Sequence, residues 1–521
     1  MRHLIFAICI LVVCKTANAQ YDPVIDTLAK AARQLRDLKS SDPHRPIFHF
    51  VNPDGYGQPF DPNGALFWNG RYHMGYIYQK ERNDKWEHLW GHIASTDLLH
   101  WQIYPDMLTV VDGDAEKDGI FSGGSFLSRE GIPHVSYHGW GANSNMAAYS
   151  VDPDLRKWVK SELNPLLSTP VSSDSSASPY TAWDPEIWYD NTEDCYYQIS
   201  GGNPATLFKS RDLKNWIFLG DFIESDKRLN LDFEDVSCPD FFKVGDKYVL
   251  LFISHMRGAQ YYIGTFANDR FTVEGHGRMN WPGGTFFAPE QLVDDTGRNI
   301  YWGWIIERKP VGQEWKYGWS GILSLPRVFS LSENNEVTIA PAEELRTLRY
   351  NHYNHQGIKL TAGTKEILTA KGKSLEITAR FEKGSGTFGL KVFASPDGRE
   401  QTIIKYDTKT EELIVDFKNS SIHAPVLMPD YCIKYYQPSD FVETLVSQQR
   451  VPMKLKEGEP LSLQVFIDRS VIEIFANGRK CVTQVVYPQL MDSEQIILFS
   501  ETGAVDVEDI HVWHMAATNS Y

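Results

Sequence analysis

The sequence predicts an all-β protein built as a five-bladed β-propeller followed by a C-terminal β-sandwich. The first observation behind this prediction is a repeat. Segments with an Asp-Leu-x-x-Trp ending close at Trp101, Trp158 and Trp216, which puts them 57 and 58 residues apart. Each unit of this length holds about four short strands with no helical periodicity between them, which is typical of blades arranged around an axis.

A second repeat marks where each blade begins. An x-Pro step opens an apolar strand, and a turn and an aromatic strand follow it. The unit at 121–137 carries Ser122-Gly123 in place of this step, and together the units predict five blades between residues 59 and 335, inside a domain spanning 46–345. The x-Pro steps are Asp61-Pro62, Asp184-Pro185, Cys238-Pro239 and Ala288-Pro289.

The sequence pattern changes after residue 345. Strands at 374–381, 401–406 and 461–475 alternate apolar and polar side chains, as in a sheet with one face in water. Seven or more such strands without helices predict a sandwich domain over 355–515. Nothing in this second domain resembles a catalytic site.

The first nineteen residues have the form of a signal peptide. Arg2 precedes an apolar run over 4–13, and Ala17-Asn18-Ala19 provides a small-x-small cleavage site. This predicts a secreted or periplasmic protein, and no later segment has the roughly twenty apolar residues that span a bilayer. The alternative of a lipidated Cys14 is less favoured because Val13 is larger than the small residue such sites prefer. A short amphipathic helix with a packing role is expected within 20–45.

Composition limits the kinds of molecule that this protein is expected to bind. Removal of residues 1–19 takes away Arg2 and Lys15, which moves the net charge from −16 to −18 and argues against nucleic-acid and anionic-membrane partners. The 25 Tyr and 15 Trp suit a carbohydrate partner, although many-stranded sheets use such residues too. The cysteines that remain are widely spaced and no His-rich cluster exists, so neither a metal nor an organic cofactor is expected.

Two aspartates are the first catalytic candidates. The first strand of each propeller blade lies nearest the axis, so Asp61, Asp184 and the stretch 234–238 should meet at one mouth. Hydrolysis of a glycosidic bond needs one carboxylate to attack or to activate water and one carboxylic acid to protonate the leaving oxygen. Asp61 also fits an ordinary turn, and Asp184 could merely order the start of its strand. However, Cys238 and Ala288 occupy the same position in later blades, so the fold itself does not demand an acid there.

These residues resemble glycoside hydrolase family 32, which contains invertases, inulinases and levanases. The resemblance covers most of the chain and rests on 61–64, Tyr78-Gln79, 90–92, 95–101, 121–123, 184–185, 301–304, 318–327 and 466–477. It implies that Asp61 is the nucleophile and that Asp184 steadies the transition state. It also implies substrate contacts by Asn63, Gln79, Trp90 and Ser122.

The chain departs from the family pattern at two positions. Trp183 stands where the family usually has Arg, which replaces a charged donor by a stacking surface. Ser237 stands where the family usually has its acid/base glutamate, and a serine cannot protonate a leaving group at neutral pH. Glu234 is the favoured replacement, ahead of Asp235, Glu186 and Glu290. In the alternative reading Glu234 is a solvated loop acid and the activity is lost or altered.

The function that follows is the release of fructose from β-fructofuranosides such as sucrose, inulin or levan by a retaining mechanism with two carboxyl groups. Two alternatives remain open at this point. One is a fructan-binding protein that does not hydrolyse its ligand. The other is a hydrolase of a different furanoside, such as an arabinofuranoside.

Overall fold

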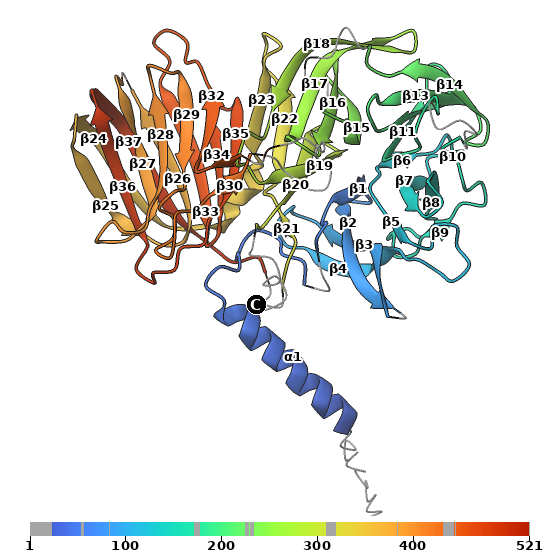
Figure 1. The fold of residues 1–521 in the computed structure, drawn as a ribbon, viewed down its shortest axis with the longest axis horizontal. Helices are drawn as coiled ribbons and strands as arrows, with labels where there is room; N and C mark the ends of the chain where they lie inside the picture. The colour runs from blue at the N-terminus through green and yellow to red at the C-terminus, as the bar shows by residue number, and fades with distance from the viewer. Residues whose placement is uncertain are drawn as a thin grey trace, which may run out of the picture.

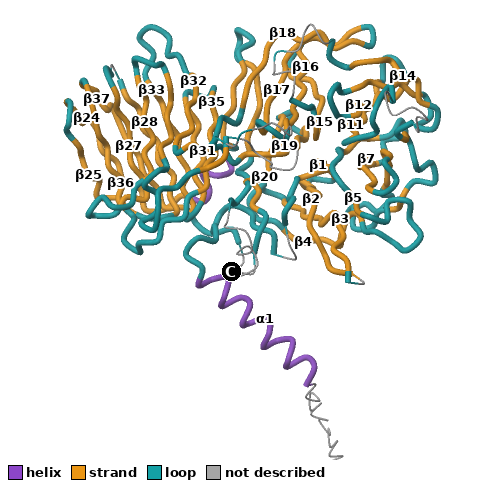
Figure 2. The backbone as a smooth tube through the Cα atoms, in the orientation of Figure 1, coloured by secondary structure: helices purple, strands orange, loops and turns teal. Residues whose placement is uncertain are grey.

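The computed structural model describes residues 23–519 except 54–56, 83, 171–177, 225–228, 230–233, 309–318, 383, 431–441 and 443. The predicted leader, including Cys14, therefore lies outside the described residues. Figure 1 shows two β-rich bodies side by side and one helix that projects from them, and Figure 2 shows how completely strands dominate both bodies. The predicted class, a propeller followed by a sandwich, is confirmed.

Five antiparallel sheets follow one another in the first body. Sheet 1 holds β1 (Pro62–Trp68), β2 (Arg71–Arg82), β3 (Lys85–Ser95) and β4 (Gln102–Leu108). Sheet 2 holds β5 (Gly119–Ile120), β6 (Ser125–Leu127), β7 (Pro133–Trp140), β8 (Ser144–Tyr149), β9 (Val159–Lys160) and β10 (Leu167–Ser168). Sheet 3 holds β11 (Pro185–Asp190), β12 (Cys195–Ser200), β13 (Thr206–Ser210) and β14 (Trp216–Asp221). Sheet 4 holds β15 (Ser237–Val244), β16 (Lys247–Ser254), β17 (Gly258–Ala267) and β18 (Arg270–Arg278). Sheet 5 holds β19 (Phe286–Val293), β20 (Asn299–Ile305), β21 (Ile322–Leu323), β22 (Arg327–Leu331) and β23 (Val337–Pro341).

Early strands of these sheets form a closed ring. β1 contacts β6 and β19, β11 contacts β6 and β15, and β15 contacts β19. The later strands of each sheet lie progressively farther from this ring, in the order β1-β2-β3-β4 in sheet 1 and β15-β16-β17-β18 in sheet 4. Residues at the start of β1, β11 and β15 are therefore brought together around one axis.

The Asp-Leu-x-x-Trp repeat is a structural turn that precedes the outermost strand. In the third copy, Asp212 accepts the backbone N–H groups of Lys214 and Asn215 at 3.0 and 2.8 Å, and Leu213 has a left-handed φ of 61°. The indole N–H of Trp216 then donates to the Leu213 carbonyl at 3.0 Å. The repeat marks the turn that leads into β4, β9 and β14 in sheets 1, 2 and 3.

The second body is a sandwich of two six-stranded antiparallel sheets. A 3-10 helix, η3 (Glu343–Leu348), leads into it. One sheet has the order β24 (Arg349–Thr361), β37 (Ala504–Met515), β26 (Ser374–Phe381), β33 (Leu461–Asp468), β34 (Val471–Ala476) and β35 (Lys480–Val485). The other has the order β25 (Lys365–Lys371), β36 (Gln495–Thr502), β27 (Thr387–Ala394), β28 (Thr402–Asp407), β29 (Glu412–Asp416) and β32 (Gln448–Pro452). A short pair, β30 (Met428–Pro429) and β31 (Leu445–Val446), lies apart from both.

A buried ionic network joins the two bodies. Glu473 of β34 accepts from the Arg327 guanidinium, from the Leu325 N–H at 2.8 Å and from the His49 ring at 3.1 Å. Asp468 of β33 accepts the other ring nitrogen of His49 at 3.0 Å. Burial lowers the pKa of His49, but its hydrogen bonds to Asp468 and Glu473 raise it to about 9. The segment that precedes sheet 1 is thus fixed by the second body.

The N-terminal helix differs from its expected role. α1 (Pro23–Ser41) forms where helical spacing predicted it, but Figure 1 shows it projecting away from the body. Val24, Leu28 and Leu38 on its apolar face are 64%, 64% and 45% exposed. The expectation that this helix packs is therefore wrong as far as the described residues show. No helix in the described part of the chain has the length and apolar character to cross a membrane.

Candidate active site

Asp61 and Asp184 converge on the thiol of Cys238. The Cys238 Sγ lies 3.9 Å from Asp61 Oδ2 and 3.7 Å from Asp184 Oδ2, and the Cys238 N–H donates to Asp184 Oδ2 at 3.0 Å. Asp61 precedes β1, Asp184 precedes β11 and Cys238 lies in β15, so the closed ring of inner strands brings them together. The structure joins the two aspartates that the sequence singled out.

The backbone at this meeting point is unusual. Asp184 and Cys238 have φ values of 32° and 44°, in a region that L-residues with side chains rarely adopt. Ala288 occupies the equivalent position before Pro289 with a φ of 42°. The conformation therefore recurs at the x-Pro steps of sheets 3, 4 and 5 but not at Asp61 in sheet 1. The choice of side chain at these positions decides what the mouth can do.

Burial governs the acidity of the pair. It raises the pKa of Asp61 to about 6, against the hydrogen bond from Ser122 and the positive charge of His255. Burial also raises the pKa of Asp184 to about 6, against the Cys238 N–H and the same His255 charge. Ser122 Oγ donates to Asp61 Oδ2 at 2.8 Å, whereas the buried Oδ1 has no hydrogen-bond partner among the described residues.

A histidine that sequence reasoning missed lies beside the pair. His255 follows β16 directly, and its charge acts on both Asp61 and Asp184. Asp235 accepts the His255 N–H at 2.9 Å through Oδ1 and the ring Nδ1 at 2.5 Å through Oδ2. Ser237 also donates to Asp235 Oδ2, at 2.8 Å. The only signal in the sequence was a histidine directly after the second strand of a blade, at the end where the aspartates lie.

Glu234 takes a different place from the one expected of it. Its side chain is fully buried, and both carboxylate oxygens accept from the Arg278 guanidinium at 3.0 and 3.1 Å. Gln260 donates to the same carboxylate at 3.3 Å. Arg278 and Gln260 belong to β18 and β17, the two outer strands of sheet 4, so Glu234 is directed away from the ring. Glu234 is therefore neither the expected proton donor at the mouth nor a solvated loop acid.

Asn63 and Gln79 hold backbone in place around the mouth. Asn63 donates to the Asp61 carbonyl at 2.7 Å and accepts the Gly123 N–H at 3.0 Å, which ties sheet 1 to the loop that carries Ser122. Gln79 accepts the Gln58 N–H and donates to the Pro59 carbonyl, both at 3.0 Å. Both side chains are buried, so their visible role is to fix the two loops that flank Asp61.

The expectation that Trp90 contacts the substrate is contradicted by its burial. Trp90 is 0% exposed and donates its indole N–H to the Phe121 carbonyl at 3.2 Å, so its ring has no face that a sugar can reach. Trp86, four residues earlier, is 51% exposed. Ile77 pairs with Asp61, and the β2–β3 hairpin that carries Gln79 and Trp86 extends beyond that level. The sequence motif thus pointed to Trp90, which is buried, and not to Trp86, which is exposed.

Aromatic rings form one wall of the mouth. Trp183 donates its indole N–H to Ser237 Oγ at 3.1 Å, and its ring lies 4.8 Å from His138 and 6.1 Å from Trp140. Trp140 in turn lies 5.4 Å from Phe121. This wall runs from sheet 2 to sheet 3 and offers the stacking surface that Trp183 suggested in the sequence.

A second acidic layer lies deeper along the inner strands. Glu186, Asp240 and Glu290 each stand two residues after the x-Pro junction position of sheets 3, 4 and 5, and all are buried. Burial and the charge of Asp240 raise the pKa of both Glu186 and Glu290 well above its usual range. Glu290 accepts the Ala65 N–H at 2.7 Å. No group of three or more His, Cys, Asp or Glu side chains within the described ranges has an arrangement that would hold a metal ion.

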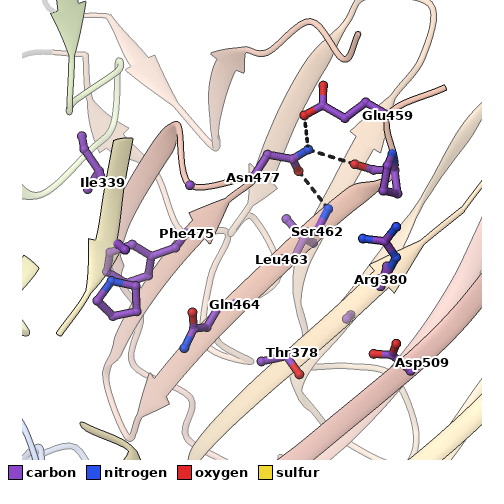
Figure 3. A pocket seen from close by; sticks show the side chains of 15 residues that line it. Ile339, Thr378, Arg380, Glu459, Ser462, Leu463, Gln464, Phe475, Asn477 and Asp509 are labelled. Atoms are coloured by element: carbon purple, nitrogen blue, oxygen red, sulfur yellow. Dashed lines mark hydrogen bonds between the residues drawn. The ribbon is translucent and has the colours of Figure 1, made fainter. Parts of the chain in front are cut away.

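A separate hollow lies away from this site. It measures about 560 Å³ and lies between β23 and the first sandwich sheet. Figure 3 shows that Asn477 there binds Glu459, Pro460 and Ser462, contacts that fix a turn of the sandwich. None of the predicted site residues lines it.

Comparison with known proteins agrees with the fold. The N-terminal domain of glycosyl hydrolases family 32 matches residues 49–341, and the C-terminal domain of that family matches residues 344–514. Fructan 1-exohydrolase w3 from Triticum aestivum is 27% identical, with 94% of this chain and 90% of that protein covered. The insoluble β-fructofuranosidase isoenzyme CWINV2 from Arabidopsis thaliana is 26% identical, with 98% and 97% covered.

Solved structures share the fold. Fructan 1-exohydrolase IIa from Cichorium intybus superposes with a TM-score of 0.76 at 22% identity, covering 91% of this chain and 98% of that one. Exo-inulinase from Aspergillus awamori superposes with a TM-score of 0.72 at 21% identity, covering 92% and 99%. With both family domains matched in order over most of its length, this chain belongs to glycosyl hydrolases family 32.

Proposed function

We propose that this protein is a glycosidase that releases fructose from β-fructofuranosides, with sucrose and fructans such as inulin and levan as the substrate class. The observation that carries the proposal is the meeting of Asp61 and Asp184 at Cys238, in a chain that belongs to family 32. The names of its relatives, fructan 1-exohydrolases and β-fructofuranosidases, support this substrate class. The leader predicted at residues 1–19 and the cell-wall isoenzymes among the relatives support action outside the cell.

Asp61 acts as the nucleophile. Ser122 orients the Asp61 carboxylate through Oδ2, and the carboxylate attacks the anomeric carbon of the fructofuranosyl unit and forms an ester with it. Water then hydrolyses this ester, and two displacements at one carbon retain its configuration. The ordinary state of Asp61 above its pKa of about 6 is the carboxylate that this step requires.

Asp184 orients the sugar. Its Oδ2 is held by the Cys238 N–H at 3.0 Å, which fixes the carboxylate beside the reacting carbon and leaves its other oxygen for sugar hydroxyl groups. The wall of Trp183 and Trp140 supplies an apolar surface for a ring face. Neither role requires a cofactor.

A fructan-binding protein without hydrolytic activity is the second candidate. The observation that favours it is Ser237 at the position of the family's acid, together with the Arg278 ion pair that occupies Glu234. Such a protein would bind fructans and release no sugar.

The experiment is the measurement of fructose released from sucrose, inulin and levan by purified residues 20–521 and by the Asp61→Asn variant. We expect release by the unmodified protein and a loss of several orders of magnitude in the variant, because an amide oxygen is a poor nucleophile. Binding of the same sugars without any release would overturn the proposal in favour of the binding protein.

A further inference from the structure

The proposed hydrolysis needs a proton donor that neither Ser237 nor Glu234 supplies. Departure of a sugar alkoxide without a proton is slow, and general acid catalysis of this step contributes about 10²–10⁴-fold to the rate. A general acid has to carry a proton on the atom that faces the leaving oxygen. Both oxygens of Glu234 instead accept N–H groups of Arg278. The inference below rests on the proposed function and concerns the same site.

His255 stands where that proton is needed. Ser237 pairs with Ile253 across β15 and β16, so His255 emerges at the end of sheet 4 where Ser237 and Cys238 begin the inner strand. Cys238 contacts both Asp61 and Asp184. The side chain of His255 is 12% exposed, and the ring of Phe287 packs against it with 6.0 Å between centroids. The imidazole is therefore held at the mouth, partly open to it.

Asp235 fixes both the position and the tautomer of this ring. Its two oxygens take the backbone N–H and the ring Nδ1 of His255, so Nδ1 carries a proton and the second proton of the imidazolium is on Nε2. Ser237, the residue in the place of the family's glutamate, donates to the same carboxylate. Asp235 accepts through both oxygens and is thus a positioning residue, not a proton donor.

The charged groups that face His255 all stabilise its cation. They are Asp235 on its own sheet, Asp184 at the start of sheet 3 and Asp61 at the start of sheet 1. Burial lowers the pKa of His255, but the charge and hydrogen bond of Asp235 and the charges of Asp184 and Asp61 raise it above the ordinary value. The same pairing lowers the pKa of Asp235 against the effect of burial. Both shifts favour an imidazolium next to a carboxylate.

We propose that His255, oriented by Asp235, is the catalytic acid and base of this enzyme in place of the family's glutamate. In the first step the Asp61 carboxylate bonds to the anomeric carbon, the bond from that carbon to the leaving oxygen breaks with its electron pair on the oxygen, and the Nε2 proton of His255 moves to that oxygen. In the second step Nε2 takes a proton from water, the water oxygen bonds to the anomeric carbon, and the ester bond breaks with its electron pair returned to Asp61. The imidazolium and the carboxylate are both restored.

The test compares two substrates that differ in their need for a proton. The sugar alkoxide that leaves from sucrose needs one, whereas the p-nitrophenolate that leaves from p-nitrophenyl β-D-fructofuranoside does not. We expect His255→Gln to lower kcat/KM on sucrose by about 10²–10⁴-fold and on the aryl substrate by less than about tenfold. Asp61→Asn should lose activity on both.

His100→Gln is the matched control. Asp97 holds His100 as Asp235 holds His255, through the backbone N–H at 2.8 Å and the ring Nδ1 at 2.7 Å, but on the surface between β3 and β4. We expect this variant to keep full activity on both substrates. Asp235→Asn provides a second measurement if His255→Gln fails to fold: the alkaline limb of kcat/KM on sucrose should move to lower pH, because the carboxylate that stabilises the imidazolium is gone.

The possible outcomes distinguish a failure of this inference from a failure of the proposed function. Wild-type protein that cleaves neither substrate, nor inulin or levan, overturns both. Active wild-type protein with an unimpaired His255→Gln variant overturns the inference alone. The same holds for an equal loss on both substrates, or for a loss confined to sucrose in Glu234→Gln with His255→Gln unaffected.

Discussion

The Glu473→Gln substitution should destabilise the protein more than any change to a surface ion pair. Glutamine keeps the volume of the side chain but removes the negative charge that faces Arg327 and His49, both of which are buried. Removal of one partner from a buried ion pair costs about 3–5 kcal/mol, because the remaining charge stays buried without compensation. For a unit of 150–250 residues, the size of the sandwich, each kcal/mol lowers Tm by about 2–4 °C. We therefore expect a fall of about 6–20 °C.

Differential scanning calorimetry of Glu473→Gln beside Glu336→Gln measures this effect. Glu336 also bridges the two bodies, through Lys456 at 2.9 and 3.0 Å, but 48% of its side chain is exposed. An exposed pair contributes about 1 kcal/mol or less, so Tm should fall by no more than about 4 °C. Equal shifts in the two variants would refute the reasoning, since the buried network would then add nothing beyond a surface contact.

Three further predictions concern the mouth and the layer beneath it. On p-nitrophenyl β-D-fructofuranoside, kcat/KM should fall tenfold per pH unit below about pH 6, because Asp61, whose pKa is about 6, is protonated there and cannot attack; a profile flat down to pH 4 would contradict this. Asp240→Asn should raise Tm at pH 8 but not at pH 4. Burial raises the pKa of Asp240, so the folded state binds this proton more strongly than the unfolded state does. The stability of the wild-type protein therefore declines as pH rises above the ordinary aspartate pKa of about 4. Gly123→Ala should lower Tm and should lower kcat/KM on sucrose by at least about tenfold. The added Cβ would lie 2.1 Å from the Ser136 carbonyl oxygen and displace the loop that holds Ser122 against Asp61. Wild-type rates in this variant would show that the loop accommodates the methyl group.

The architecture was open to sequence reasoning because a period repeats where the geometry repeats. The Asp-Leu-x-x-Trp turns and the x-Pro steps marked equivalent points of successive sheets, and those points fixed Asp61 and Asp184 at the ring. Ser122, expected from the sequence to contact the substrate, stands where Ser122-Gly123 replaces an x-Pro step, and in the structure it donates to Asp61 Oδ2.

Sequence reasoning could not decide which of two nearby residues takes a given place in the structure. Glu234 and Asp235 are adjacent in the chain, yet one side chain turns to the outer strands and Arg278 while the other turns to His255. Trp86 and Trp90 lie on one strand, yet only the first is exposed. Which way such a side chain points depends on partners from distant strands, and no local pattern reports them. His255 escaped notice for the same reason, because its carboxylate partner, Asp235, lies 20 residues away in the segment before β15.

The links made by residues 47–49 have a consequence for how the chain is made. The backbone N–H groups of Ile47, Phe48 and His49 all donate to Asp468, more than four hundred residues later. During synthesis the start of the chain therefore waits for nearly all of the rest, and Arg327 waits for Glu473. A nascent chain cut short before the sandwich would therefore leave the N–H groups of residues 47–49 and the Arg327 guanidinium without these carboxylate acceptors.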